Sequence, residues 1–226
     1  MISAYLMEEL IMDKKELAKK IDHTMLKIGA SREDIIKICK EAVENKFASV
    51  AIFPSNIEIA KEVLSNSEVK ICVAISYPFG CDPISSKIFE IKGAIKRGAD
   101  ELDMVMNISA LKSGRYDLVR REFEYFFEAA DGRVTKIILE NSVLTKDEII
   151  TACMLAEDCG LDFVKTSTGF NKWGTTVDDV RLIKSIVGNK IKIKASGGIK
   201  TYQQAIELIK AGASRIGTSS SVFIVN

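Results

Sequence analysis

Lys165 ends a short apolar run and is followed at once by the turn 166–170, which reads TSTGF. A strand that ends in a lysine before a turn rich in hydroxyl groups and glycine is an unusual place for a surface lysine. A partly desolvated amine at such a point can attack a carbonyl carbon and form a Schiff base. Lys165 is therefore the candidate nucleophile.

A carboxylate and a second lysine share this pattern. In the segment 101–106 the even-numbered residues are all apolar, whereas the odd-numbered face carries two carboxylates, one of them Asp103. Because successive strand residues point to opposite faces, the apolar face is expected against helices and Asp103 inside a barrel. The same reasoning turns Lys165 and Lys194 inward, with Lys192 on the side of Lys194.

Asp103, Lys165 and Lys194 together have the charges that an amine nucleophile needs. An ordinary lysine has a pKa of about 10.4, so roughly one in 2,500 is neutral at pH 7. Burial and the neighbouring cation Lys194 would lower the pKa of Lys165 to about 7, and Asp103 would shuttle protons. The alternative is a structural ion pair of Asp103 with one lysine that fills the barrel. Lys192 is interpreted as a structural or solvated lysine.

Two late turns are typical of a phosphate-binding cradle. They follow the seventh and eighth predicted strands and contain Gly197, Gly198, Gly217, Ser219 and Ser220. Glycine lets the backbone approach an anion closely, and barrels often bind phosphate between these two loops. Gly169, after the candidate nucleophile, would add a third backbone donor.

Short apolar segments alternate with amphipathic ones along the chain. The predicted strands are 20–22, 49–53, 70–75, 101–106, 135–139, 162–166, 191–195 and 215–217. The predicted helices include 32–44, 85–97, 116–130, 146–158, 177–187 and 202–211. This alternation predicts an α/β fold, a (β/α)₈ TIM barrel, as a single domain over residues 1–226. An extra N-terminal helix at 13–20 is expected to cover the barrel bottom. A doubly wound open sheet is the alternative, although it usually has fewer strands.

The composition excludes several classes of function. The chain has 226 residues, is 47% hydrophobic and has a formal net charge of +1, so no basic field is present to hold nucleic acid or a membrane surface. Its apolar runs are too short to span a bilayer. The five cysteines form no CxxC pair and there is a single histidine, which predicts a cytoplasmic protein without a metal site.

The chain resembles the deoxyribose-phosphate aldolase family over nearly its whole length. Motifs at 162–170 (DFVKTSTGF) and 194–199 (KASGGI) carry the resemblance most specifically. Further matches are 21–26 (IDHTML), 77–80 (YPFG), 98–105 (GADELDMV), 136–140 (KIILE) and 212–220 (GASRIGTSS).

The resemblance implies a reversible aldol reaction without metal or cofactor. The family cleaves 2-deoxy-D-ribose 5-phosphate to D-glyceraldehyde 3-phosphate and acetaldehyde, and its members are commonly homodimers or higher homo-oligomers. Lys165 matches the Schiff-base lysine, Lys194 the lysine that perturbs it, and Asp103 the acid/base aspartate. The implied substrate- and phosphate-binding residues are Asp22, Thr24, Thr168, Gly169, Gly197, Gly198, Gly217, Ser219 and Ser220.

The chain also departs from the family pattern. Ala51 and Phe53 stand where a cysteine and an asparagine are usual, Trp173 replaces a glycine, and Ser221 replaces the glycine after the paired serines. No terminal tyrosine follows; the sequence ends at Asn226. These changes put the substrate preference in question more than the reaction type.

Two alternatives to this function stay open. One is a related Schiff-base aldolase for another phosphosugar, which Phe53 and Trp173 favour. The other is a non-catalytic paralogue that only binds a sugar phosphate, which the retained lysines and aspartate disfavour. His23, the only histidine, is interpreted as holding its loop through hydrogen bonds and not as a catalytic group.

Overall fold

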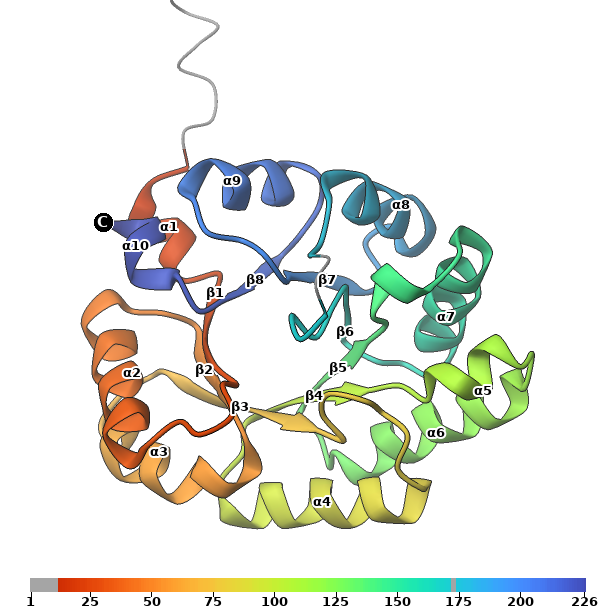
Figure 1. The fold of residues 1–226 in the computed structure, drawn as a ribbon, viewed down its shortest axis with the longest axis horizontal. Helices are drawn as coiled ribbons and strands as arrows, with labels where there is room; N and C mark the ends of the chain where they lie inside the picture. The colour runs from red at the N-terminus through yellow and green to blue at the C-terminus, as the bar shows by residue number, and fades with distance from the viewer. Residues whose placement is uncertain (1–11, 172–173) are drawn as a thin grey trace, which may run out of the picture.

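Eight parallel strands close into a barrel, and the helices form a ring outside it (Figure 1). The computed structural model describes residues 12–171 and 174–226. The strands follow one another around the barrel in chain order, and β8 pairs with β1 to close it. The predicted (β/α)₈ TIM barrel is confirmed. In the described parts of the chain, no helix is both long enough and apolar enough to cross a membrane.

The elements have the following bounds. The strands are β1 Ile21–Met25, β2 Ser49–Ile52, β3 Lys70–Ile75, β4 Glu101–Val105, β5 Val134–Ile138, β6 Phe163–Lys165, β7 Lys192–Ser196 and β8 Arg215–Thr218. The helices are α1 Lys14–Ala18, α2 Arg32–Asn45, α3 Ile57–Leu64, α4 Ile84–Arg97, α5 Ile108–Lys112, α6 Tyr116–Ala129, α7 Lys146–Asp158, α8 Val177–Val187, α9 Tyr202–Lys210 and α10 Ser221–Val225. Short 3₁₀ turns, η1 Pro54–Asn56 and η2 Asn141–Val143, follow β2 and β5.

The predicted elements differ from these in detail. The first strand was expected at 20–22 but runs to Met25, because it pairs with β2 from Asp22↔Ser49 to Met25↔Ile52. Pairing with a neighbour therefore extends the strand through polar residues that interrupt an apolar run. Three helices, α3, α5 and α10, lie outside the predicted ranges.

The extra N-terminal helix exists as α1, but it does not cover the barrel bottom as expected. It lies beside α10 in the outer ring of Figure 1. Asp13 accepts a hydrogen bond from the backbone of Lys15 and caps the helix, and the Lys14 ammonium donates to the carbonyl of Asn226 at 2.8 Å. The two ends of the barrel domain therefore meet at this side.

The apolar core lies between the barrel and the helices. Leu102 and Met104 of β4 belong to it, as do Phe123 and Phe126 of α6, and all four are buried. The opposite face of β4 is charged and points into the barrel, as the alternation predicts. Strand register then brings charged residues into one region, since Asp103 pairs with Lys136, and Lys165 with Lys194.

Candidate active site

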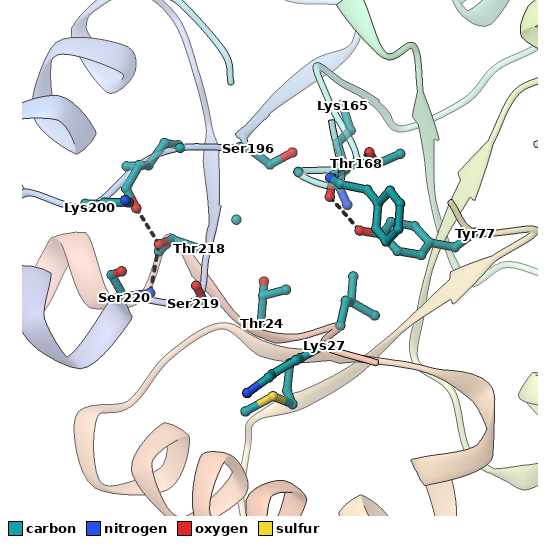
Figure 2. A pocket seen from close by; sticks show the side chains of 18 residues that line it. Thr24, Lys27, Tyr77, Lys165, Thr168, Ser196, Lys200, Thr218, Ser219 and Ser220 are labelled. Carbon is teal, nitrogen blue, oxygen red and sulfur yellow. Dashed lines mark hydrogen bonds between the residues drawn. The ribbon is translucent and has the colours of Figure 1, made fainter. Parts of the chain in front are cut away.

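A cavity of about 450 Å³ opens where strands β1, β6, β7 and β8 end. Figure 2 shows Lys165 and Thr168 on one side of it, Thr24 and Lys27 on another, and Thr218, Ser219 and Ser220 on a third. The carboxyl ends of the strands are where TIM barrels place their active sites. This cavity is therefore the candidate active site.

Most of the predicted site residues line the cavity. They are Thr24, Lys165, Thr168, Gly169, Gly197, Gly198, Gly217, Ser219 and Ser220. Asp22, Asp103 and Lys194 do not line it; they are buried beneath Lys165 in the barrel interior. Asp22 was predicted among the substrate-binding residues, but its carboxylate instead accepts from Ser49 at 2.7 Å and pairs with two cations. Contact between Asp22 and a substrate is therefore not supported by this geometry.

Lys165 and Lys194 share one carboxylate oxygen. The Nζ atoms of both lysines lie 2.7 Å from Oδ2 of Asp103. Lys165 is 3% exposed and borders the cavity, whereas Lys194 is fully buried. The amine that faces the cavity is thus Lys165, and the second lysine sits behind it.

Further charges continue this cluster below the two lysines. Asp22 Oδ2 lies 2.5 Å from Lys194 Nζ, and Asp22 Oδ1 lies 2.6 Å from Arg215. Lys136 Nζ lies 2.9 Å from Oδ1 of Asp103 and 2.6 Å from Oε2 of Glu101. In total, four basic side chains (Lys136, Lys165, Lys194 and Arg215) share three carboxylates (Asp22, Glu101 and Asp103). The cluster is neutral only if one of the four bases is uncharged.

The pKa directions identify that base. Burial lowers the pKa of Lys165, and the Lys194 cation lowers it further against the opposing attraction of Asp103. Burial also disfavours the charged form of Lys194, but Asp103 and Asp22 outweigh this and raise its pKa. The pKa of Asp103 is held well below its usual range, since three lysine cations outweigh its burial. Lys165 is thus the amine most easily deprotonated, beside a fixed cation and a fixed carboxylate.

Three members of the cluster, Glu101, Lys136 and Arg215, were missed as site residues. Lys136 is fully buried, and the Asp103 and Glu101 carboxylates raise its pKa well above its usual value although burial opposes this. The alternation within the strand 135–139 could have identified Lys136 from the sequence, since Ile137 and Leu139 face the helices and Lys136 therefore faces inward. Lys192, by contrast, is exposed at the start of β7, with its ammonium 5.5 Å from the centre of the Phe163 ring. The interpretation of Lys192 as a solvated lysine agrees with this position.

The glycines around the cavity serve two different needs. Gly169, Gly197 and Gly198 have positive φ angles of 81°, 94° and 74°, which residues with a side chain rarely adopt. A Cβ atom on Gly217 would lie 3.0 Å from Cε of Lys194. Gly217 therefore makes room for the second lysine, a role that the phosphate-cradle prediction did not include.

His23 holds the turn that carries the paired serines. Its Nδ1 lies 2.9 Å from Oγ of Ser221, and its Nε2 lies 2.9 Å from Oε2 of Glu41. The Ser221 hydroxyl also donates to the carbonyl of Thr218 at 3.0 Å. These bonds agree with the interpretation of His23 as a structural residue. Ser221, which stands where the family usually has a glycine, is one of the hydrogen-bond partners of His23.

Several further residues of the cavity wall were not predicted, among them Lys27, Lys200 and Tyr77. Lys27 and Lys200 bring two more amines to it, and the Tyr77 hydroxyl lies 2.8 Å from the Thr168 carbonyl on the same side of the cavity (Figure 2). Phe53 packs edge-on against Tyr77, with ring centres 5.7 Å apart. Trp173 lies outside the described residues.

Comparison with known proteins identifies the family. The model of the DeoC/LacD family aldolases matches residues 9–221. The chain belongs to this family. It is 50% identical to the deoxyribose-phosphate aldolase of Caldicellulosiruptor saccharolyticus over 95% of this chain and 99% of that protein. It is also 50% identical to the enzyme of the same name from Thermococcus gammatolerans, over 93% of this chain and 95% of that one.

Solved structures of aldolases share the fold of this DeoC/LacD family member. The tetrameric deoxyribose-phosphate aldolase of Aeropyrum pernix superposes with a TM-score of 0.89 at 30% identity, over 94% of this chain and 91% of that one. An aldolase described as QR15 superposes with a TM-score of 0.90 at 40% identity, over 93% and 94% of the two chains. The barrel and the amine cluster thus sit in an aldolase framework.

Proposed function

We propose that this protein is a class I aldolase that reversibly cleaves 2-deoxy-D-ribose 5-phosphate to D-glyceraldehyde 3-phosphate and acetaldehyde. The proposal rests on the buried cluster, in which four bases share three carboxylates. The amine of this cluster that loses its proton most easily, Lys165, borders the cavity. The names of relatives 50% identical to this chain supply the substrate.

In the proposed mechanism Lys165 is the nucleophile. Its neutral Nζ attacks the aldehyde carbon C1 of the open-chain sugar, and loss of water gives a protonated imine. Removal of the proton from the hydroxyl on C3 then lets the C2–C3 bond break, and its electron pair passes into the imine to form an enamine. Glyceraldehyde 3-phosphate leaves; protonation of the enamine carbon and hydrolysis release acetaldehyde and restore the amine.

Asp103 and Lys194 support these steps in different ways. Asp103, a carboxylate held by lysine cations, accepts and returns protons, and a water molecule carries them to the sugar. Lys194 keeps its positive charge and so disfavours a charge on Lys165. Both roles are proposals that rest on the 2.7 Å contacts to Oδ2 of Asp103.

The phosphate end of the substrate has a polar wall to bind. Gly169, Gly197, Gly198 and Gly217 let the backbone come close to an anion, and Ser219 and Ser220 add hydroxyl groups. Lys27 and Lys200 add positive charge on two sides of the cavity. Thr24 lines a separate side of the cavity from this wall and from Lys165 in Figure 2, and we propose that it contacts the sugar.

A direct assay tests this function. Purified protein is given 2-deoxy-D-ribose 5-phosphate, and glyceraldehyde 3-phosphate is detected by a coupled dehydrogenase. Turnover that survives a chelator such as EDTA is expected, since the amine cluster supplies the chemistry. Absence of turnover with this and other sugar phosphates would support the non-catalytic paralogue instead.

A different phosphosugar preference is the second candidate. The contact of Phe53 with Tyr77 at the cavity favours it, because Phe53 stands where the family usually has an asparagine. A larger kcat/KM for ribose 5-phosphate or a ketose phosphate than for the deoxy sugar would establish it.

We also propose that the protein is a homodimer or a larger homo-oligomer and acts in the cytoplasm. The tetrameric relative from Aeropyrum pernix supports the assembly, and the five cysteines, all of them free, support the location. Light scattering on the purified chain measures the mass of the assembly.

A further inference from the structure

Two strained residues lie in the loops that follow β3 and β5. Ser76 directly follows β3 and Glu140 follows β5 by two positions, and their φ angles are +50° and +60°. Residues other than glycine seldom adopt this left-handed conformation, and where they do so the surrounding structure must hold them in it. Hydrogen bonds from both sites lead to one residue, Thr168, three positions after Lys165.

Glu140 holds Thr168 from one side. Its buried carboxylate accepts two hydrogen bonds through Oε2, from the backbone N–H of Thr168 at 3.1 Å and from the Thr168 hydroxyl. Its other oxygen, Oε1, accepts from the hydroxyl of Ser142 at 3.1 Å. Hydrogen bonds to a charged acceptor are stronger than neutral ones, so this contact fixes the turn firmly.

Tyr77 holds Thr168 from the other side. Its hydroxyl donates to the Thr168 carbonyl at 2.8 Å, which Figure 2 shows as a dashed line across the cavity edge. The preceding residue, Ser76, is fixed in turn: its N–H donates to Glu90 at 2.8 Å and its hydroxyl to Asp82 at 2.6 Å. The strained backbone at Ser76 therefore directs the ring of Tyr77 toward Thr168.

All three polar groups of Thr168 are thus occupied. Its hydroxyl oxygen also accepts from the N–H of Phe170 at 3.0 Å, so its one proton goes to Glu140 and not to a ligand. The start of the same turn is tied to β7, since the N–H of Thr166 donates to the carbonyl of Lys194 at 3.1 Å. The backbone from Lys165 to Thr168 is anchored at both ends.

We propose that Glu140 and Tyr77 are positioning residues for the reaction, which act through Thr168 to fix the turn that carries Lys165. The inference rests on the proposed aldolase function. Neither residue needs to touch the reacting atoms. A displaced nucleophile loses rate even when the substrate still binds, so the two residues are expected to affect kcat more than KM.

Paired variants test this inference. Tyr77→Phe removes only the hydroxyl that reaches Thr168, and its matched control is Tyr202→Phe, which removes a comparable bond from a tyrosine hydroxyl to the carbonyl of Met12 at 2.6 Å. Glu140→Gln removes the charge that Thr168 binds, and its matched control is Ser142→Ala, which removes the bond to the other carboxylate oxygen. For each variant kcat, KM, Tm and the rate of borohydride trapping at Lys165 are measured.

The expected result is a loss in kcat and trapping rate of about threefold to tenfold for Tyr77→Phe, and about tenfold or more for Glu140→Gln, with KM within about twofold. The controls should keep the wild-type kcat even where Tm falls. Because both residues act on Thr168, the double variant should lose less than the product of the two single losses.

Unchanged kcat in both variants, or losses that multiply independently, would overturn the inference. If Glu140→Gln does not fold, the comparison of kcat and trapping rate between Tyr77→Phe and Tyr202→Phe is sufficient to test the positioning role. A wild-type protein without aldol turnover would refute the proposed function itself, whereas an active wild type with fully active Tyr77→Phe would refute only the positioning role.

Discussion

The part of the chain that the structure describes buries two lysine–carboxylate clusters, and they differ in what the lysine can do. Between α4 and α6, Lys87 Nζ lies 2.6 Å from Oε1 of Glu122 and donates to the carbonyl of Val105 at 2.8 Å. The other oxygen of Glu122 accepts from the N–H of Asn107 at 2.8 Å. One cation here faces one anion, and both side chains are 2% exposed.

The barrel cluster is equally buried, but its charges are not matched one to one. Its four bases share three carboxylates, and Lys165 borders a cavity large enough for a small ligand. Burial alone therefore does not make a lysine reactive. An excess of positive charge, together with an opening to a cavity, separates the proposed nucleophile from the structural lysine.

The largest expected difference concerns the two lysines themselves. Lys165→Met should reduce aldol turnover by at least about 10⁴-fold, because no other amine among the described residues borders both Asp103 and the cavity. Circular dichroism and Tm should show an intact fold, since the variant removes the base in excess. Turnover within tenfold of wild type would contradict the assignment.

Lys87→Met should show the opposite pattern. Removing one partner of a buried pair leaves Glu122 unpaired and should destabilise the fold by about 3–5 kcal/mol, measured by urea unfolding. The kcat per folded molecule should stay at the wild-type value. Replacing both partners, as in Lys87→Met with Glu122→Leu, should restore most of the stability; a failure to do so would mean that the pair does more than balance charge.

Lys194→Met should shift the pH dependence of the reaction. The neutral form of Lys165 is the active one, so kcat/KM should rise with pH through the lowered pKa of this amine and fall as pH decreases through it. Loss of the Lys194 cation should raise that pKa and move the acid limb to higher pH, with a loss of about 10²–10³-fold at neutral pH. An unchanged acid limb would exclude Lys194 as the perturbing charge.

The smallest effect is expected from Gly217→Ala. The added methyl would lie 3.0 Å from Cε of Lys194, so the lysine must move by a few tenths of an ångström. We expect a decrease in kcat of about threefold to tenfold with a smaller change in KM. A rise in KM alone would show instead that Gly217 serves only the phosphate.

Much of this contrast could be predicted from the sequence, because the alternation of side chains within one strand shows which of them point inward without knowledge of the neighbouring strands. Asp103, Lys165 and Lys194 face inward as predicted, and the glycine turns line the cavity. The charge balance was not visible, since it depends on strand register: Lys136 meets Asp103, and Arg215 reaches Asp22, only when the barrel closes.

The residues that hold Thr168 in place could not be predicted from the sequence, because their contacts join distant parts of the chain. Glu140 and Tyr77 meet Thr168 from two loops that lie far apart in the chain, with sequence separations of 28 and 91 residues. No local pattern marks such contacts. Lys87 was equally hidden, because its position in the amphipathic helix 85–97 does not reveal the carboxylate of Glu122 across from it.

Borohydride trapping measures directly whether Lys165 is the amine that reacts. The protein is incubated with acetaldehyde, reduced at neutral pH and mapped by peptide mass spectrometry, with Lys87 and Lys194 as internal comparisons. The expected result is one ethyl group per chain, on Lys165, and a parallel loss of activity. Modification of Lys194 or of surface lysines, with Lys165 unmodified and the activity retained, would contradict it.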